Sequence, residues 1–234
     1  MTYLLINTFI SLQFLLIYNS LELTNKKETL TRPTSSVGVE SDLERFSENK
    51  TIPDEIREVT LEALSYFPDL LETEIDFQFK KAIHGSVMQA QPKISSLFFS
   101  SKKTRGYRIK ISRELVLEDD SIPIEDLPRD VLLGWIGHEL GHIKDYLDRS
   151  ALNLLGFGVR YYLSNTFITE AEIAADSYAV AFGLGEKIIA TKNFVLNHEK
   201  IPLDYKKKIE KLYLSPGEIL SMVDTDTEGN QEEN

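Results

Sequence analysis

The most constraining feature of this sequence is the pattern His138-Glu139-Leu140-Gly141-His142, which contains two of the four histidines in the chain. On an α-helix, residues four positions apart lie on the same face, so both imidazoles can reach one metal ion. Glu139 then points about 100° away from His138, as the helical repeat requires. That direction suits a base acting on metal-bound water rather than a ligand. The chain is therefore expected to fold around a metal-binding helix.

The flanking residues predict that this helix is buried. It is expected to begin near Pro128, because proline is favoured in a first helical turn, and to run through Tyr146. Two histidines and a glutamate in a buried helix need partners, since unpaired buried polar groups are costly. A metal ion meets that need, and a pair of hydrogen-bonded core histidines is the alternative. The apolar residues that indicate burial are Val131, Leu132, Leu133, Trp135, Ile136, Leu140 and Ile143.

The absence of cysteine restricts metal ligands to nitrogen and oxygen atoms. A catalytic zinc ion takes three protein ligands and leaves one position to water, so a third ligand is expected further along the chain. Glu172 and Asp176 lie four residues apart, and the longer Glu172 is the better candidate ligand. Asp176 is then placed to accept the second ring N–H of a zinc-bound histidine. Glu170 is interpreted as part of a solvated face, and cobalt, nickel and manganese are alternatives to zinc.

These motifs resemble those of the gluzincin metallopeptidases. The pattern E-x-x-A-D-x-x-A, which begins at Glu172, is most similar to the group that contains the HtpX-like and CAAX-prenyl peptidases. The resemblance implies a zinc cofactor, Glu172 as the third ligand, Asp176 as support for the first histidine, and peptide or protein substrates. Many members of that group carry several transmembrane helices, whereas this chain has at most one candidate. The ImmA/IrrE-like peptidases are the alternative, although they usually have an asparagine where Asp176 stands.

Ligand chemistry predicts the mechanism. Bound zinc polarises the peptide carbonyl and lowers the pKa of its water towards about 7. Glu139 would take the water proton and later deliver it to the leaving amine. The tetrahedral oxyanion needs a further donor, for which His198 is the first candidate because the chain has so few histidines. An exposed surface residue is the alternative interpretation of His198, and the other candidate donors are Tyr161, Tyr162, Tyr178 and Tyr205.

Helix and strand patterns predict an α+β domain with a zincin-like fold, in which a small antiparallel sheet precedes a mainly helical metal-binding half. Strands are expected at 75–79, around 95–100 and at 106–112, with SSKKTRG as a hairpin turn between the last two. Similar folds have a strand edge that binds extended peptides, and 107–112 is the candidate strand. Helices are expected near 53–71, 128–146, 151–163, 170–182, 185–197, 204–212 and 216–223.

The chain is expected to have four parts. Residues 1–20 form an apolar segment and 21–50 a polar linker, followed by a metallopeptidase domain at 51–223 and an acidic disordered tail at 224–234. The apolar segment is slightly short for a transmembrane helix and lacks a clear signal-peptide pattern. It is interpreted as a signal or membrane anchor, which predicts a membrane-anchored or exported protein. A buried N-terminal helix, and with it a cytoplasmic protein, is the alternative.

A net charge of −11 and a pI near 4.9 argue against nucleic-acid binding through a general basic surface. The sequence therefore predicts a zinc-dependent endopeptidase with Glu139 as general base. One alternative is a zinc-binding regulatory or partner-interaction module without turnover, and the intact Glu139 argues against it. The other is a soluble ImmA-like regulatory peptidase that cleaves one specific partner.

Overall fold

The structure is a computed structural model that describes residues 42–101 and 104–229. The predicted apolar segment and most of the predicted linker lie outside the described residues. A compact unit begins at Leu43, earlier than the predicted domain start at 51. The short helix η1 (Glu44–Ser47) buries Phe46, and strand β1 (Lys50–Thr51) pairs with the next strand. The end of the predicted linker is therefore part of the folded unit.

The main sheet has four strands in the order β1-β2-β4-β3. β2 pairs in parallel with both β1 and β4, whereas β3 pairs antiparallel with β4. The α+β class is confirmed, but the prediction of an antiparallel sheet is wrong, because the sheet is mixed. Helix α3 (Arg57–Ser65) lies between β1 and β2 in the chain and provides the crossover that these two parallel strands require. The remaining strands are β2 (Ile75–Lys80), β3 (Met88–Pro92), β4 (Tyr107–Ser112) and a separate hairpin of β5 (Glu114–Val116) and β6 (Ser121–Pro123).

The alternation of apolar residues correctly predicted β2 and β4. Tyr107, Ile109 and Ile111 are completely buried, and Phe77 of β2 lies beside Ile109. β4 lies between β2 and β3, so both of its edges are already paired. The prediction that 107–112 offers a free edge for a peptide is therefore wrong, and β3 is the edge strand on that side.

The strand predicted around 95–100 is wrong. Those residues form the short helix α4 (Ile94–Phe99), in which Ser96 Oγ donates to the carbonyl of Lys93 and Leu97 points inward. The antiparallel partner of β4 is β3, whose Met-Gln-Ala-Gln-Pro sequence has too few large apolar residues to indicate a strand. The SSKKTRG stretch consequently joins α4 to β4 rather than two strands.

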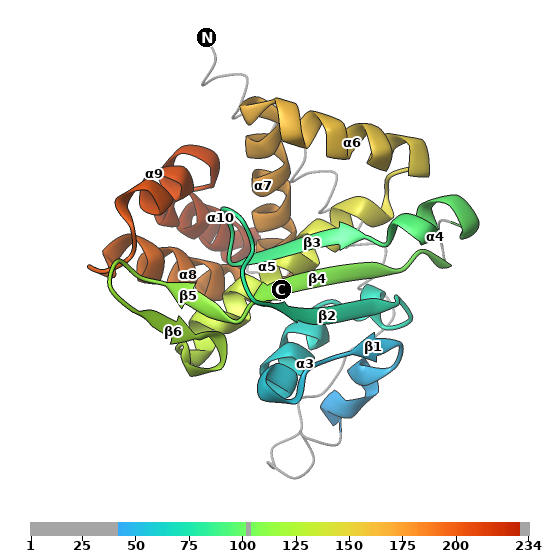
Figure 1. The fold of residues 1–234 in the computed structure, drawn as a ribbon, viewed down its shortest axis with the longest axis horizontal. Helices are drawn as coiled ribbons and strands as arrows, with labels where there is room; N and C mark the ends of the chain where they lie inside the picture. Colours follow the sequence, from blue (N-terminus) through green and yellow to red (C-terminus); the bar gives the residue numbers. More distant parts are fainter. Residues whose placement is uncertain (1–41, 102–103, 230–234) are drawn as a thin grey trace. The chain divides into compact units, whose positions relative to one another are not determined.

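Helices make up most of the remaining chain, and Figure 1 shows α3 on one side of α5 with α7 and α8 on the other. The helices predicted at 151–163 and 185–197 are confirmed, whereas the one predicted at 53–71 is α-helical only in α3. The longer helices are α3 (Arg57–Ser65), α5 (Arg129–Leu147), α6 (Ala151–Leu163), α7 (Asn165–Ala179), α8 (Gly185–Asn197), α9 (Leu203–Leu212) and α10 (Pro216–Gly229). Short 3-10 turns are η2 (Asp54–Ile56), η3 (Pro68–Leu70) and η5 (Ile124–Asp126).

The bounds of two helices, α7 and α10, differ from the prediction by several residues. α7 begins at Asn165 because Ser164 Oγ caps it by accepting from the N–H of Phe167. It ends in a π-helical segment η6 (Val180–Leu184), where Gly183 adopts a φ of 88° that favours glycine. α10 runs through Gly229, past the predicted start of the acidic tail at 224. Among the described residues, no helix has the length and apolarity needed to cross a bilayer.

The close approach of α5 and α7 depends on a glycine within the histidine motif. A Cβ added at Gly141 would collide with the backbone of Ala175 on α7, which is itself fully buried. This contact involves backbone rather than a flexible side chain, so the helices would have to separate. Gly141 therefore sets the distance at which α7 delivers its acidic residues to the histidines.

We expect Gly141→Ala to destabilise the metal-free protein by about 1–3 kcal/mol, the range for overpacking a well-packed interior. Urea unfolding measures this change. The matched control is Gly156→Ala on α6, where an added Cβ meets nothing within 4 Å. The control should change stability by less than about 1 kcal/mol, in the stabilising direction, because alanine favours helix. Equal stabilities of the two variants would contradict this role for Gly141.

Candidate metal centre

Helix α5 places the two histidines of the motif on one face. Their rings lie 4.8 Å apart between centroids at an interplanar angle of 85°. His138 is 8% exposed and His142 is 5% exposed, because the helix that carries them is enclosed by the sheet and by α7 and α8. Both imidazoles are therefore largely shielded from water.

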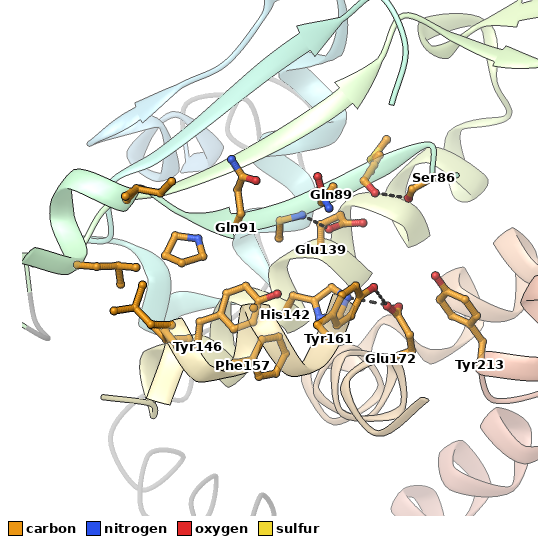
Figure 2. Close-up of a pocket in the computed structure, with 18 of the residues that line it drawn as sticks. Ser86, Gln89, Gln91, Glu139, His142, Tyr146, Phe157, Tyr161, Glu172 and Tyr213 are labelled. Carbon is orange, nitrogen blue, oxygen red and sulfur yellow. Dashed lines mark hydrogen bonds and ion pairs between the residues drawn. The ribbon is translucent and has the colours of Figure 1, made fainter. Parts of the chain in front are cut away.

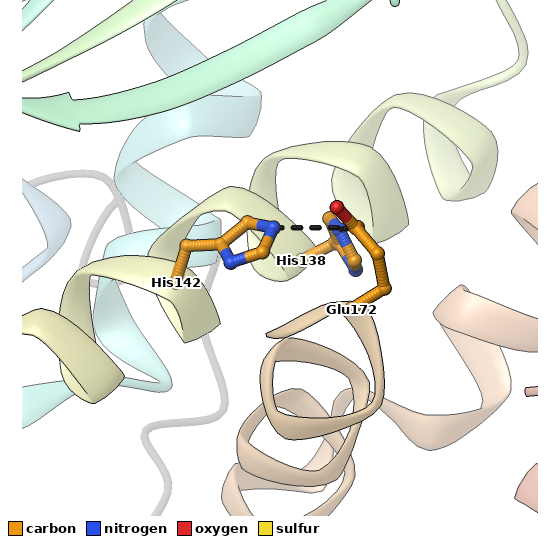
Figure 3. Close-up of side chains that lie close together, drawn as sticks. All are labelled: His138, His142 and Glu172. Atoms are coloured by element: carbon orange, nitrogen blue, oxygen red, sulfur yellow. Dashed lines mark hydrogen bonds and ion pairs between the residues drawn. The ribbon is translucent and has the colours of Figure 1, made fainter. Parts of the chain in front are cut away.

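Glu172 of α7 completes the predicted set of ligands (Figure 3). Its Oε2 lies 3.0 Å from Nε2 of His138 and 3.4 Å from Nε2 of His142. Ligand atoms around a tetrahedral zinc ion, each about 2.0–2.1 Å from the metal, are roughly 3.3 Å apart. All three ligand atoms lie within 4.8 Å of one another. The two separations from Glu172 and the two-nitrogen, one-oxygen chemistry therefore fit a metal site, and the three groups converge as predicted.

Asp176 lies where the sequence predicts a supporting carboxylate. Its Oδ1 is 2.8 Å from Nδ1 of His138, and its Oδ2 is 2.9 Å from Nζ of Lys192 on α8. A hydrogen bond from Nδ1–H to Asp176 keeps Nε2 of His138 directed towards Glu172. Lys192 is only 5% exposed, so this is a buried ion pair behind the histidine.

Tyr161 of α6 contacts the other oxygen of the glutamate. Its hydroxyl donates to Oε1 of Glu172 over 2.5 Å, while Oε2 faces the histidines. This contact holds the carboxylate in one rotamer. Tyr161 was considered in the sequence only as an oxyanion donor, and no spacing rule connects it to Glu172.

Glu139 lies beside the three groups without joining them. Its Oε2 accepts from the backbone N–H of Ala90 on β3, and the residue lines the cleft together with His142 and Glu172. Burial is the main reason that the pKa of Glu139 is raised, although charge on the two histidines partly offsets it. A raised pKa suits a carboxylate that must accept and return a proton near neutral pH.

The site opens into a cleft of about 680 Å³ between β3 and helices α4, α5 and α6 (Figure 2). Tyr213, which follows α9, also lines the cleft, and its ring centroid lies 5.7 Å from that of His138. His198 does not line it. That histidine ends α8 with its ring centroid 5.2 Å from that of Phe194. The structure therefore does not bring the predicted oxyanion donor His198 to the site.

Sequence reasoning missed three groups at this site: Lys192, Tyr213 and the backbone of Ala90. Lysines are usually exposed, so the sequence gives no reason to place Lys192 in the interior. Tyr213 lies 41 residues beyond Glu172, in a segment whose position depends on the packing of α9. Ala90 could be found only by recognising β3 as a strand and as the edge of the sheet.

The electrostatics of the centre predict that metal binding releases a proton. Burial lowers the pKa of His138, but hydrogen bonds and charge from Asp176 and Glu172 outweigh it and raise this pKa to about 10. In Glu172 the effect of burial is likewise outweighed, because the two histidines hold its pKa well below the usual range. At neutral pH we therefore expect the metal-free centre to contain a protonated His138 and an ionised Glu172.

Zinc needs a neutral Nε2, so binding at pH 7 should release about one proton from His138. Apparent zinc affinity should then rise about tenfold per pH unit between pH 6 and 8, because this range lies below the pKa of the metal-free protein. Titration calorimetry in buffers of different ionisation enthalpy measures the released protons. An affinity independent of pH over this range would contradict a protonated His138.

Lys192→Met should weaken the centre without touching a ligand. Removing one partner of a buried ion pair typically costs about 3–5 kcal/mol, measurable by urea unfolding. Loss of a group supporting a metal ligand should lower zinc affinity by about 10- to 100-fold. Lys187→Met on the same helix is the matched control, because Lys187 pairs with the exposed Asp130 at 2.9 Å. The control should cost less than about 1 kcal/mol and leave zinc affinity unchanged.

Comparison of the chain with models of known protein families, with curated proteins and with solved structures gave no match. Interpretation of the site therefore depends on its residues and their geometry.

Proposed function

We propose that this protein is a zinc-dependent endopeptidase with a zincin-like fold. The observation that carries the proposal is the position of Glu139, which faces the same cleft as His142 and Glu172 but lies outside the ligand set. A site that only stored or sensed a metal would not need a buried carboxylate of raised pKa on the side of the ligands that faces the cleft.

The donor set supports zinc as the resident metal. His138, His142 and Glu172 would supply two nitrogens and one oxygen, the arrangement typical of catalytic zinc, which keeps one position open. Bound zinc would polarise the substrate carbonyl and lower the pKa of the zinc-bound water towards neutral pH. The same ligands also accept cobalt or manganese, so the metal present after purification must be identified directly.

The protein groups have distinct roles in this proposal. Glu139 accepts the proton of the attacking water and returns it to the leaving amine. Tyr213 replaces His198 as the candidate donor to the oxyanion, because its side chain lines the cleft beside the histidines. The edge strand β3 binds the peptide backbone by strand addition, since its outer side has no strand partner among the described residues.

The proposal is tested by incubating the purified full-length protein with a mixture of peptides and identifying products by mass spectrometry. Cleavage should require zinc, disappear on treatment with a phenanthroline chelator, and return when zinc is restored. Bound zinc without any products would instead favour a zinc-binding module. Recovery of the native protein in membranes would favour an anchored peptidase, and recovery in the cytosol a soluble regulatory one.

A further inference from the structure

The cleft beside the candidate metal centre has two chemically different ends. Figure 2 shows Gln91, Tyr146 and Phe157 on one side of Glu139, and Ser86 and Tyr213 on the other. Because β3 runs from Met88 to Pro92, its carboxyl end leads towards the first of these sides. Position along the cleft can therefore be given relative to the direction of β3.

The end of the cleft beyond Pro92 is apolar. It is formed by α4, which follows β3 in the chain, and by the first half of α6, and Figure 1 shows these two segments at the same end of β3. None of the side chains that α4 and this half of α6 contribute to the lining is charged or polar. They are Ile94, Leu97, Leu154, Leu155 and Phe157, which we call the apolar end of the cleft.

The opposite end contains polar groups. Ser86 and Lys208 line it together with Tyr213, and Lys208 Nζ donates to the carbonyl of Gly85. The ionisable side chains that line the cleft are limited, in the part of the chain that the structure describes, to Glu139, His142, Glu172, Lys208 and the tyrosines. Ser86 and Lys208 therefore lie on the other side of Glu139 from the apolar end, whose α4 and α6 side chains are all apolar.

The apolar end is open to an incoming chain rather than closed as core. Leu97, Leu154 and Phe157 are each less than 9% exposed, whereas Ile94 is 71% and Leu155 is 38% exposed. A buried floor with an exposed rim is the form expected of a pocket that binds a large apolar side chain. Its continuity with Glu139 and with the edge of β3 that has no strand partner among the described residues indicates a peptide bound along that edge.

Resting on the proposed function, we infer that the substrates are peptides with bulky apolar side chains on the amino side of the scissile bond. An added strand pairs best antiparallel to β3, because antiparallel pairing is slightly more stable per residue. The amino-terminal half of the peptide then lies at the carboxyl end of β3, against the apolar end of the cleft. The carboxyl-terminal half lies against the polar end and should prefer polar side chains.

Two measurements on the full-length, zinc-loaded protein test this inference. The first maps cleavage sites in a mixture of random-sequence peptides, where leucine, isoleucine, phenylalanine and methionine should be enriched at least about tenfold on the amino side. The second measures binding of two fluorescent peptides to Glu139→Gln by anisotropy. One peptide has its apolar residues in the amino-terminal half, and the other has the same residues in reversed order. The first should bind about tenfold more tightly.

Leu155→Glu places a charge at the rim of the apolar end without disturbing the buried floor, so folding should be preserved. This variant should lose both the preference for cleavage after apolar residues and the preference for binding the peptide whose amino-terminal half is apolar. Leu152→Glu on the same helix is the matched control, because Leu152 is 82% exposed and does not line the cleft. The control should keep both preferences, which separates an effect within the cleft from a general effect of added charge on α6.

The outcomes distinguish the inference from the proposed function. Cleavage without the amino-side preference, or with preferences that Leu155→Glu leaves intact, overturns the inference and leaves the peptidase function standing. Absence of cleavage by the zinc-loaded protein contradicts the peptidase function, and the binding comparison then decides the inference. Equal binding of the two peptides overturns it, whereas preferential binding that Leu155→Glu abolishes supports it for a peptide-binding protein.

Discussion

Glu172→Ala should remove zinc from the protein. The wild-type chain should carry about one zinc ion, whereas this variant keeps only the two histidine ligands of α5. If a zinc-binding free energy of roughly 12 kcal/mol is shared equally by three protein ligands, loss of one ligand removes about 4 kcal/mol. Zinc affinity should then fall on the order of a thousandfold. Metal analysis after dialysis against a weak chelator, with titration against a zinc-sensitive dye, measures the loss.

The matched control for this change is Glu170→Ala, on the same helix. Glu170 is exposed and is not part of the ligand group, so its removal should leave zinc content at the wild-type value. Full zinc occupancy and unchanged affinity in Glu172→Ala would mean that the two histidines bind metal with some other group. That result would contradict the three-ligand centre.

Glu139→Gln should abolish turnover while leaving zinc in place. Glutamine has the shape of glutamate, and its amide oxygen can still accept the N–H of Ala90, but it cannot take a proton from water. Removal of a general base typically lowers kcat by about 10²- to 10⁴-fold. The measurement compares initial rates on a peptide identified as a substrate, at equal zinc content.

Zinc content and unfolding by urea provide the controls for Glu139→Gln. Zinc content should match that of the wild type. The free energy of unfolding should match it or be slightly higher, because a buried carboxylate is replaced by a neutral group. A variant that keeps zinc and also keeps more than about a tenth of wild-type activity would exclude Glu139 as the general base. Simultaneous loss of zinc would instead show that Glu139 supports the metal centre.

The groups at the metal centre were predictable because their geometry is local. His138 and His142 share a helix face, and Glu172 and Asp176 share another, so the fixed helical repeat determines each pair once the helices are recognised. The α+β class followed from the same periodicities. The contact between the histidine helix α5 and the acidic helix α7 was predicted from chemistry, because a metal ion bound by two imidazoles needs a third ligand such as a carboxylate.

The sheet could not be predicted to the same depth, because its order depends on contacts far apart in the sequence. The apolar alternation of β4 would be the same in a central strand and in an edge strand. It therefore could not show that β3, and not β4, forms the edge of the sheet at the cleft. β3 was missed because its alanine and proline are poor strand residues and Met88 is its only large apolar residue. The roles of Lys192 and Tyr213 depend on how α8 and α9 pack, and so does the position of His198, which does not line the cleft.

We propose that this protein hydrolyses peptide bonds only when zinc occupies the centre formed by His138, His142 and Glu172. The most direct test is to strip the metal from the full-length protein, add zinc in substoichiometric steps, and measure both bound zinc and peptide hydrolysis. We expect activity to rise in proportion to bound zinc and to reach a plateau at about one ion per chain. Full occupancy without hydrolysis of any peptide in a diverse mixture, or hydrolysis that persists in the metal-free protein, would contradict the claim.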